Sequence, residues 1–160
     1  MPTSLETLSR YRAAHADDHE SRRVWLFHSH AYFDHEAPER VEEARAFMDR
    51  IARTFAGNGH VEMHSFMPRP IGPHPLGNFE VLFTREVFAD YVSWLAFERP
   101  EPMDILIHAL SRLQTPDHTT RAIWLGTPIA VDRAMLEAVD VRLIASGRSE
   151  EDIIEGTKKH

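Results

Sequence analysis

Hydrophobic and polar residues alternate along the first strongly patterned segment, residues 24–33, which reads VWLFHSHAYF. One side of this segment carries Trp25, Phe27, Ser29, Ala31 and Phe33, and the other carries Leu26, His28, His30 and Tyr32. A period of two with aromatic residues predicts a β-strand. Three further strands are expected at residues 60–67, 78–84 and 103–109.

The pattern changes to steps of three and four between residues 38 and 56, as in an amphipathic helix. The residues that share one face there are Val41, Ala44, Met48, Ile51 and Phe55. A second helix is expected at residues 86–97 and a third at residues 131–139. The segment 67–77, rich in proline and glycine, is expected to be a loop, as is the segment 114–119.

The expected order is β-α-β-β-α-β with additional elements, which predicts the α+β, ferredoxin-like split βαβ fold. Both crossover helices then cover one face of an antiparallel sheet. The other face is open, or is covered by a partner subunit or by the C-terminal segment. A chain of 160 residues suits one domain. We expect its core at about residues 24–139, with residues 1–22 and 141–160 peripheral.

Charge and composition exclude several classes of protein. The net charge of −7 argues against binding to nucleic acid or to an anionic membrane surface. The absence of cysteine excludes disulfides, zinc fingers, iron–sulfur clusters and a thiol nucleophile. The N-terminal residues contain no apolar signal region, and no stretch approaches the roughly 20 apolar residues of a membrane helix. A cytoplasmic protein is expected.

The eleven histidines are the unusual feature of the composition. Alternation along the strands predicts that His28, His30 and Tyr32 lie on the open face of the sheet, because the aromatic set faces the helices. Glu80 of the third strand and His108 of the fourth are expected on the same face. In a ferredoxin-like sheet the first strand lies between these two, so the side chains are predicted to be neighbours.

Imidazoles and a carboxylate on adjacent strands, about 5 Å apart, can share one metal ion. The candidate ligands are therefore His28, His30, Glu80 and His108. Two histidines and one carboxylate suit Fe(II), Mn(II) or Zn(II) and leave positions open for substrate and oxygen. The alternative is a set of half-buried histidines bonded to their neighbours, with Glu80 paired to an arginine.

Two loop histidines are candidates for acid–base chemistry. His74 stands between two prolines, which restrict the backbone and aim the side chain. His118 follows Asp117, and such a pair can hold one tautomer of the imidazole or can cap the next segment. Each is either an acid–base group or part of the loop architecture. The other internal histidines, His35, His60 and His64, are expected at the surface.

Four motifs together resemble the DOPA 4,5-dioxygenase family over about residues 25–136. They are His28-x-His30-x-Tyr32-Phe33; Gly72-Pro73-His74-Pro75 followed by Phe79-Glu80-Val81; the strand end Leu106-Ile107-His108; and Asp117-His118-Thr119 followed by Ala122-x-Trp124-Leu125-Gly126. One departure is visible. The family tends to have proline and a Thr-Gly turn after the fourth-strand histidine, whereas this chain has Ala109-Leu110-Ser111, so its local turn and its substrate preference are expected to differ.

The resemblance implies extradiol cleavage of a catechol by non-haem Fe(II) and O2, in a homodimer built on the open sheet face or on a sheet edge. It implies that three of the four candidate ligands hold the iron, with His28 and His108 as first choice among the histidines. His74 or His118 would move a catechol proton, and Tyr32 would hydrogen-bond the substrate.

Two other functions stay open. One is a non-oxidative zinc or manganese enzyme, and the other is a dimeric α+β module that binds an aromatic ligand without turnover. The residues alone lead only as far as a metal site on a ferredoxin-like sheet.

Overall fold

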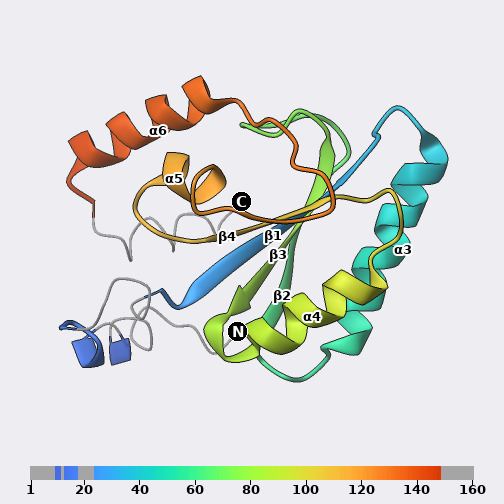
Figure 1. Cartoon of the computed structure of the whole chain (residues 1–160), viewed down its shortest axis with the longest axis horizontal. Helices are drawn as coiled ribbons and strands as arrows, with labels where there is room; N and C mark the ends of the chain where they lie inside the picture. The colour runs from blue at the N-terminus through green and yellow to red at the C-terminus, as the bar shows by residue number, and fades with distance from the viewer. Residues whose placement is uncertain (1–9, 12, 18–23, 149–160) are drawn as a thin grey trace.

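A computed structural model describes residues 10–11, 13–17 and 24–148 (Figure 1). These residues form a five-stranded sheet in the order β2-β3-β1-β4-β5, and every pair of neighbours is antiparallel. The strands are β1 Leu26–Phe33, β2 Val61–Met67, β3 Gly77–Thr84, β4 Ile105–Ala109 and β5 Ile123–Leu125. The order of the first four is that of the ferredoxin-like fold, as predicted, and β5 extends the sheet beside β4.

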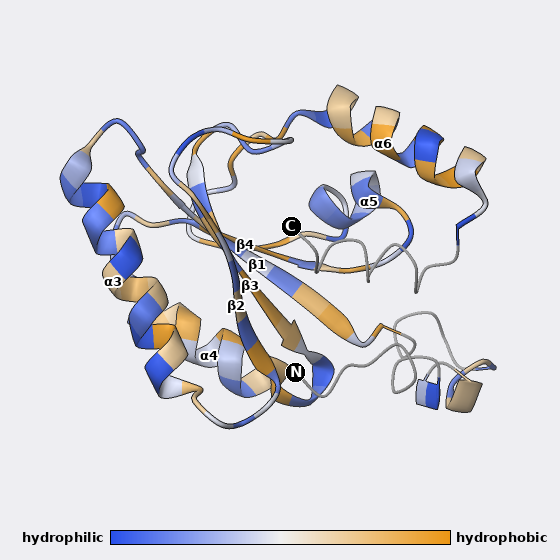
Figure 2. Ribbon diagram, turned by 180° about the vertical axis from the view of Figure 1, so that it is seen from behind, coloured by the Kyte–Doolittle hydropathy of each residue, from blue (hydrophilic) through white to orange (hydrophobic). Residues whose placement is uncertain are grey.

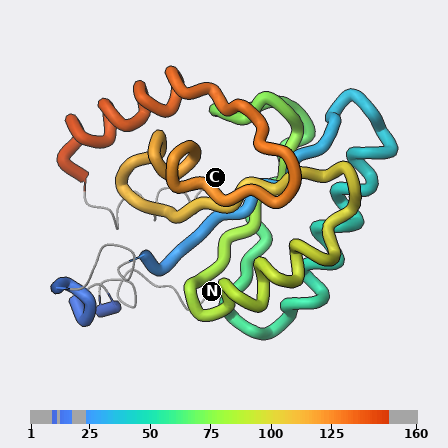
Figure 3. Tube along the Cα trace, viewed as in Figure 1, coloured from blue at the N-terminus to red at the C-terminus, as the bar shows by residue number. Residues whose placement is uncertain are grey.

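The helices lie on both faces of the sheet. They are α3 Pro38–Thr54, α4 Phe88–Glu98 with the 3-10 turn η1 Arg85–Val87 before it, α5 Gln114–His118 and α6 Arg133–Ser146. The two crossover helices, α3 and α4, cover one face, and α5 and α6 lie over the other (Figure 1). The path from β4 through α5 and β5 to α6 can be followed in Figure 3. None of the helices in the described residues is both long and apolar enough to cross a membrane.

The main core lies between the sheet and the two crossover helices. Helix α3 turns apolar residues toward the sheet and polar ones away from it (Figure 2). The central buried residues are Ala31, Phe33, Phe47, Ile51, Phe79, Val81, Phe83, Tyr91, Leu95, Ile105 and Ile107. Ala31, Phe33, Phe79, Val81 and Phe83 are the sheet residues predicted to face the helices, so the assignment of faces from alternation is confirmed.

Trp25 departs from that assignment. It was expected on the helix face, but it packs with Leu26, Leu82 and Leu110 in a second, smaller cluster. The strand begins at Leu26, so the pleat does not fix the direction of the preceding side chain.

Two segments are more helical than the sequence predicts. Segment 114–118 was expected to be a loop but forms the single-turn helix α5. Helix α6 continues seven residues past the expected end at Val139 and stops where Gly147 adopts φ 63°, a left-handed conformation that favours glycine. Asp132 caps the start of α6 by accepting a hydrogen bond from the Met135 amide at 3.0 Å.

Candidate active site

Three strands present polar side chains on the sheet face opposite the crossover helices. In the register of the sheet, His28 of β1 stands beside His108 of β4, and His30 stands beside Glu80 of β3. The three histidines are almost fully buried, with exposed fractions of 5% or less. Alternation along the strands therefore brings these side chains together as the sequence indicated.

The loop before β3 and the end of α5 add two further histidines. His74 and His118 are buried above the sheet, and their rings lie 4.3 Å and 6.0 Å from the ring of His30. Within the described residues, two groups have possible ligand atoms that all lie within 4.8 Å of one another. One group is His28, His30 and His108, and the other is His30, His74 and His118. His30 belongs to both, so the five side chains form one histidine cluster.

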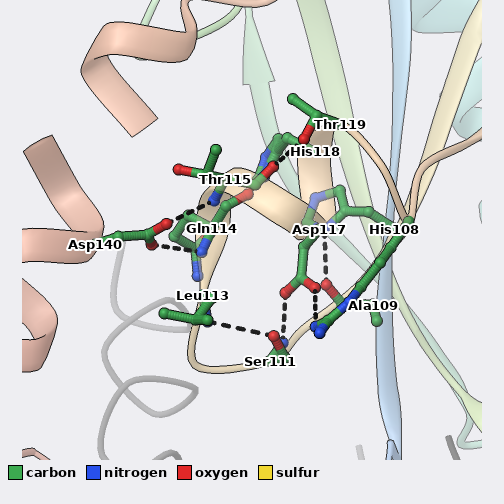
Figure 4. Close-up of polar contacts among 11 residues, drawn as sticks. His108, Ala109, Ser111, Leu113, Gln114, Thr115, Asp117, His118, Thr119 and Asp140 are labelled. Atoms are coloured by element: carbon green, nitrogen blue, oxygen red, sulfur yellow. Dashed lines mark hydrogen bonds and ion pairs between the residues drawn. The ribbon is translucent and has the colours of Figure 1, made fainter. Parts of the chain in front are cut away.

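Hydrogen bonds set the tautomers of three of these histidines. Nδ1 of His108 donates to the carbonyl of Ala109 at 2.8 Å, and Nδ1 of His118 donates to the carbonyl of Gln114 at 2.9 Å (Figure 4). Nδ1 of His30 lies 3.2 Å from the side-chain oxygen of Asn78. Because these oxygens only accept hydrogen bonds, each Nδ1 carries the proton and each Nε2 carries a lone pair.

The Nε2 atoms of His30 and His108 face each other at 3.1 Å. With both tautomers set in this way, no proton stands between the two lone pairs, which therefore repel unless a cation binds both. Two nitrogens bound at about 2.1 Å to one metal ion, at a right angle, lie about 3 Å apart. Nε2 of His28 is also buried, and it has no hydrogen-bond partner among the described residues. The donor set present in the cluster fits a metal ion.

Glu80 lies behind the histidines. Its carboxylate oxygens are 2.9 Å from Nδ1 of His64 and 3.6 Å from Nδ1 of His30. Carboxylates in this position orient histidine ligands of metals and raise their basicity. Burial acts to raise the pKa of Glu80, but the hydrogen bond from His64 and the electrostatic effect of the nearby histidines together outweigh it, so the pKa is lowered and the group stays ionised. Within the described residues, the ion-pair partners of Glu80 are histidines rather than an arginine.

His64 is a site residue that the sequence reading missed. It was expected at the surface of an edge strand, but its side chain is only 10% exposed and it lines the cavity described below. The pairing of β2 with β3 slips between Met63 and Phe66, which redirects the side chains there. His60 and His35 are half-buried rather than fully exposed, and Nδ1 of His60 bonds the Thr84 hydroxyl at 2.9 Å.

Tyr32 lies beneath His74 rather than at the cavity surface. Its hydroxyl is 2.7 Å from Nδ1 of His74, and its ring stacks against Trp124 at 5.8 Å. It is 2% exposed and is not among the residues that line the cavity. Its contacts therefore position His74. Asp117 likewise does not bond its neighbour His118: it accepts from the Ser111 amide at 2.9 Å, and burial raises its pKa to about 6.

A cavity of about 670 Å³ opens above the histidine cluster. Its floor includes His28, His30, His74 and His118, and its walls are mainly apolar side chains of β2, the loop before β3, and α6. Burial lowers the pKa of all five clustered histidines, to about 4 for His28, so they are neutral near pH 7. Neutral imidazoles bind metals and accept protons.

Asp140 of α6 holds α5 in place. Its two carboxylate oxygens accept hydrogen bonds from the backbone amides of Gln114 and Thr115, at 2.6 Å and 2.9 Å (Figure 4). The carbonyl of Gln114 in turn holds His118. The cap comes from a residue 26 positions away along the chain, which explains why local sequence does not predict α5.

Replacing Asp140 with alanine is expected to lower the free energy of unfolding by about 1–3 kcal/mol, because two backbone amides lose their acceptor. Asparagine, which keeps one acceptor oxygen, should cost less. Urea denaturation measures both effects. Glu137→Ala on the exposed side of α6 is the matched control and should change stability by about 0.5 kcal/mol or less, since its partner Arg133 is also exposed. Equal effects of the alanine variants at 140 and 137 would contradict the role of the cap.

Comparison with known proteins adds independent evidence. Residues 27–135 match the model of the Dopa 4,5-dioxygenase family. A DOPA 4,5-dioxygenase of Amanita muscaria is 30% identical over 112 residues, which cover 69% of this chain and 49% of that protein. An uncharacterized 21.2 kDa protein of Botryotinia fuckeliana is 34% identical over 119 residues, or 69% of this chain and 63% of that one. The chain thus spans about half to just under two thirds of the length of these relatives.

A solved structure is also similar. The crystal structure of a "putative dioxygenase" from Nostoc punctiforme matches with a TM-score of 0.61 and 28% identity, over 76% of this chain and 99% of that one. Together with the sheet order, this match supports the ferredoxin-like fold on which the histidine cluster lies under a cavity. More particularly, the chain belongs to the Dopa 4,5-dioxygenase family, as its motifs indicated.

Proposed function

We propose that this protein is an extradiol dioxygenase that cleaves the ring of a catechol with non-haem Fe(II) and O2. The observation that carries the proposal is the pair of Nε2 atoms of His30 and His108, 3.1 Å apart with their Nδ1 protons bonded elsewhere, beside a cavity that His28 and His30 line. His28, His30 and His108 would hold the iron. Bound there, the iron would acidify a coordinated catechol and provide open positions for dioxygen.

The remaining histidines supply acid–base groups. His118 keeps its Nδ1 proton on the Gln114 carbonyl, so its Nε2 is free to accept a proton from a catechol hydroxyl. His74, held by Tyr32, lies 5.7 Å from His118 between ring centroids and is the second candidate. Both are neutral at pH 7, because burial lowers each pKa.

The proposed reaction balances without a further reductant. The carbon–carbon bond beside the diol breaks, and one atom of O2 joins each of the two freed carbons, giving a single ring-opened product that carries an aldehyde and a carboxylic acid. The apolar walls of the cavity would exclude water from this step. The homodimer and the cytoplasmic location expected from the sequence remain predictions.

The test is anaerobic reconstitution with Fe(II), followed by O2 and one of L-DOPA, caffeate or protocatechuate. Uptake of about one O2 per catechol with a yellow product is the expected result. The activity of His108→Ala should be lower by about 100-fold or more, because loss of a metal ligand should reduce activity more than loss of a residue that only orients a ligand. His60→Ala, immediately before β2 and outside the cavity lining, is the control and should keep its activity.

Metal binding without O2 uptake for any catechol would contradict the dioxygenase. It would favour the alternative of a non-oxidative zinc or manganese enzyme, for which the same cluster is a suitable ligand set.

A further inference from the structure

The outer wall of the cavity comes from a part of the chain beyond the family match. The match ends at residue 135, whereas Leu136, Val139 and Leu143 of α6 line the cavity opposite the histidine floor. Their spacing of three and four places them on one side of the helix. The floor thus belongs to the segment that defines the family, and this wall does not.

Helix α6 is tied to both segments that carry the loop histidines. At its start, the amide of Asp132 donates to the carbonyl of Pro73 at 2.8 Å, next to His74. In its middle, Asp140 accepts from the amides that begin α5, which ends at His118. These two attachments fix the distance between the wall and the histidine floor.

The wall residues differ in how much surface they leave for a ligand. Leu136 is 3% exposed and packs as an ordinary core residue. Val139 and Leu143 are only half-buried although they line the cavity, so part of their apolar surface can be covered by a bound molecule. The opposite side of α6 carries Val141 and Ile144, exposed by 67% and 57%, which do not line the cavity.

We propose that α6 is the specificity-determining element of the cavity and that Val139 and Leu143 select the substituent on the catechol ring. A catechol whose hydroxyls lie at the histidine floor directs the substituent at its far side toward α6, where an apolar chain gains contact. The substrate class is therefore a catechol with an apolar substituent opposite the diol. This inference rests on the proposed function for the identity of the ring.

The test measures binding, not turnover. The anaerobic Fe(II)-loaded protein is titrated by calorimetry with catechol, 4-methylcatechol, 4-ethylcatechol and 4-butylcatechol. Affinity is expected to increase along the series for the wild type, by about fourfold for each methylene that becomes buried. Leu143→Ala and Val139→Ala should each lower the affinity for 4-butylcatechol by about tenfold and change the affinity for unsubstituted catechol by no more than about twofold.

A variant that fills the cavity gives an independent check. Val139→Phe should exclude 4-butylcatechol and still bind catechol, so the result does not depend on a variant that has lost packing. Val141→Ala and Ile144→Ala are the matched controls on the exposed side and should leave all four affinities unchanged.

The possible outcomes separate this inference from the proposed reaction. If variants at 139 and 143 change the preference for longer ring substituents but no catechol causes O2 uptake, the role of α6 in binding is supported and the dioxygenase reaction is contradicted. Equal losses for catechol and 4-butylcatechol, unchanged selectivity in all variants, or no binding of any of the four by the wild type would overturn the role of α6.

Discussion

Replacing His30 with alanine is expected to abolish metal binding and, with it, activity. His30 is the residue shared by the two groups of possible ligands, and its Nε2 faces that of His108 at 3.1 Å. A metal present at about 100 times its dissociation constant should stabilise the wild type by about 2.7 kcal/mol. For a chain of this size that raises the melting temperature by roughly 5–10 °C. The metal affinity of the variant should fall by about 100-fold or more, so that its shift at the same metal concentration is about 2 °C or less.

Single variants of the two groups then locate the ion. Loss of the thermal shift in His28→Ala with retention in His74→Ala would assign the metal to His28, His30 and His108. The reverse would assign it to His30, His74 and His118, and would make the proposed ligand set wrong. His60→Ala serves as the control for unspecific loss of a histidine. A His30→Ala protein that still binds one metal ion tightly would remove the basis of the proposed function.

The metal-free protein is expected to lose most of its stability between about pH 6.5 and pH 4, because its clustered histidines stay neutral there. Burial, as the largest cause, lowers the pKa of His28 from 6.5 to about 4. Below pH 6.5 the unfolded chain takes up a proton that the folded chain does not, so stability falls as the pH falls. His28 alone accounts for about 3 kcal/mol across this window, at about 1.4 kcal/mol per pH unit.

The other clustered histidines shift in the same direction, since burial lowers the pKa of each. Asp117 has the opposite effect. Burial raises its pKa from 3.8 to about 6, so its protonation stabilises the folded protein as the pH falls. This gain offsets roughly the loss that one histidine causes. The net loss of stability is comparable with a large part of the free energy of unfolding of a typical domain, about 5–15 kcal/mol.

Urea denaturation of the metal-free protein at about pH 7.5 and about pH 5 measures this loss. Substituting His28 with glutamine should reduce the slope of stability against pH by about 1.4 kcal/mol per pH unit, because one proton fewer is taken up on unfolding. Saturation with metal should raise the stability at both pH values without flattening the curve, because ligated histidines stay deprotonated in the folded protein while those of the unfolded chain still take up protons. Equal stability of the metal-free protein at the two pH values would contradict the neutral state of the buried cluster.

Alternation of side chains was enough to predict the sheet faces and to bring His28, His30, Glu80 and His108 together. That inference works because the pleat of a strand is local and strict. It fails where geometry depends on distant residues. The slip in β2 that turns His64 inward depends on pairing with β3, and the short helix α5 depends on Asp140. Tyr32 was assigned to the correct face, but only the position of the His74 loop puts it beneath that histidine.

The hydrogen bonds that Nδ1 of His30, His108 and His118 donate have a kinetic consequence. Backbone carbonyls and Asn78 hold these rings in place, so the rings have little freedom to turn away from one another before an ion arrives. Uptake of the ion should then be a simple second-order process whose rate increases in proportion to metal concentration, with no slow rearrangement after it. A site of this kind discriminates between metals by how well each ion matches a fixed spacing of nitrogens, because it cannot adjust that spacing to the ion.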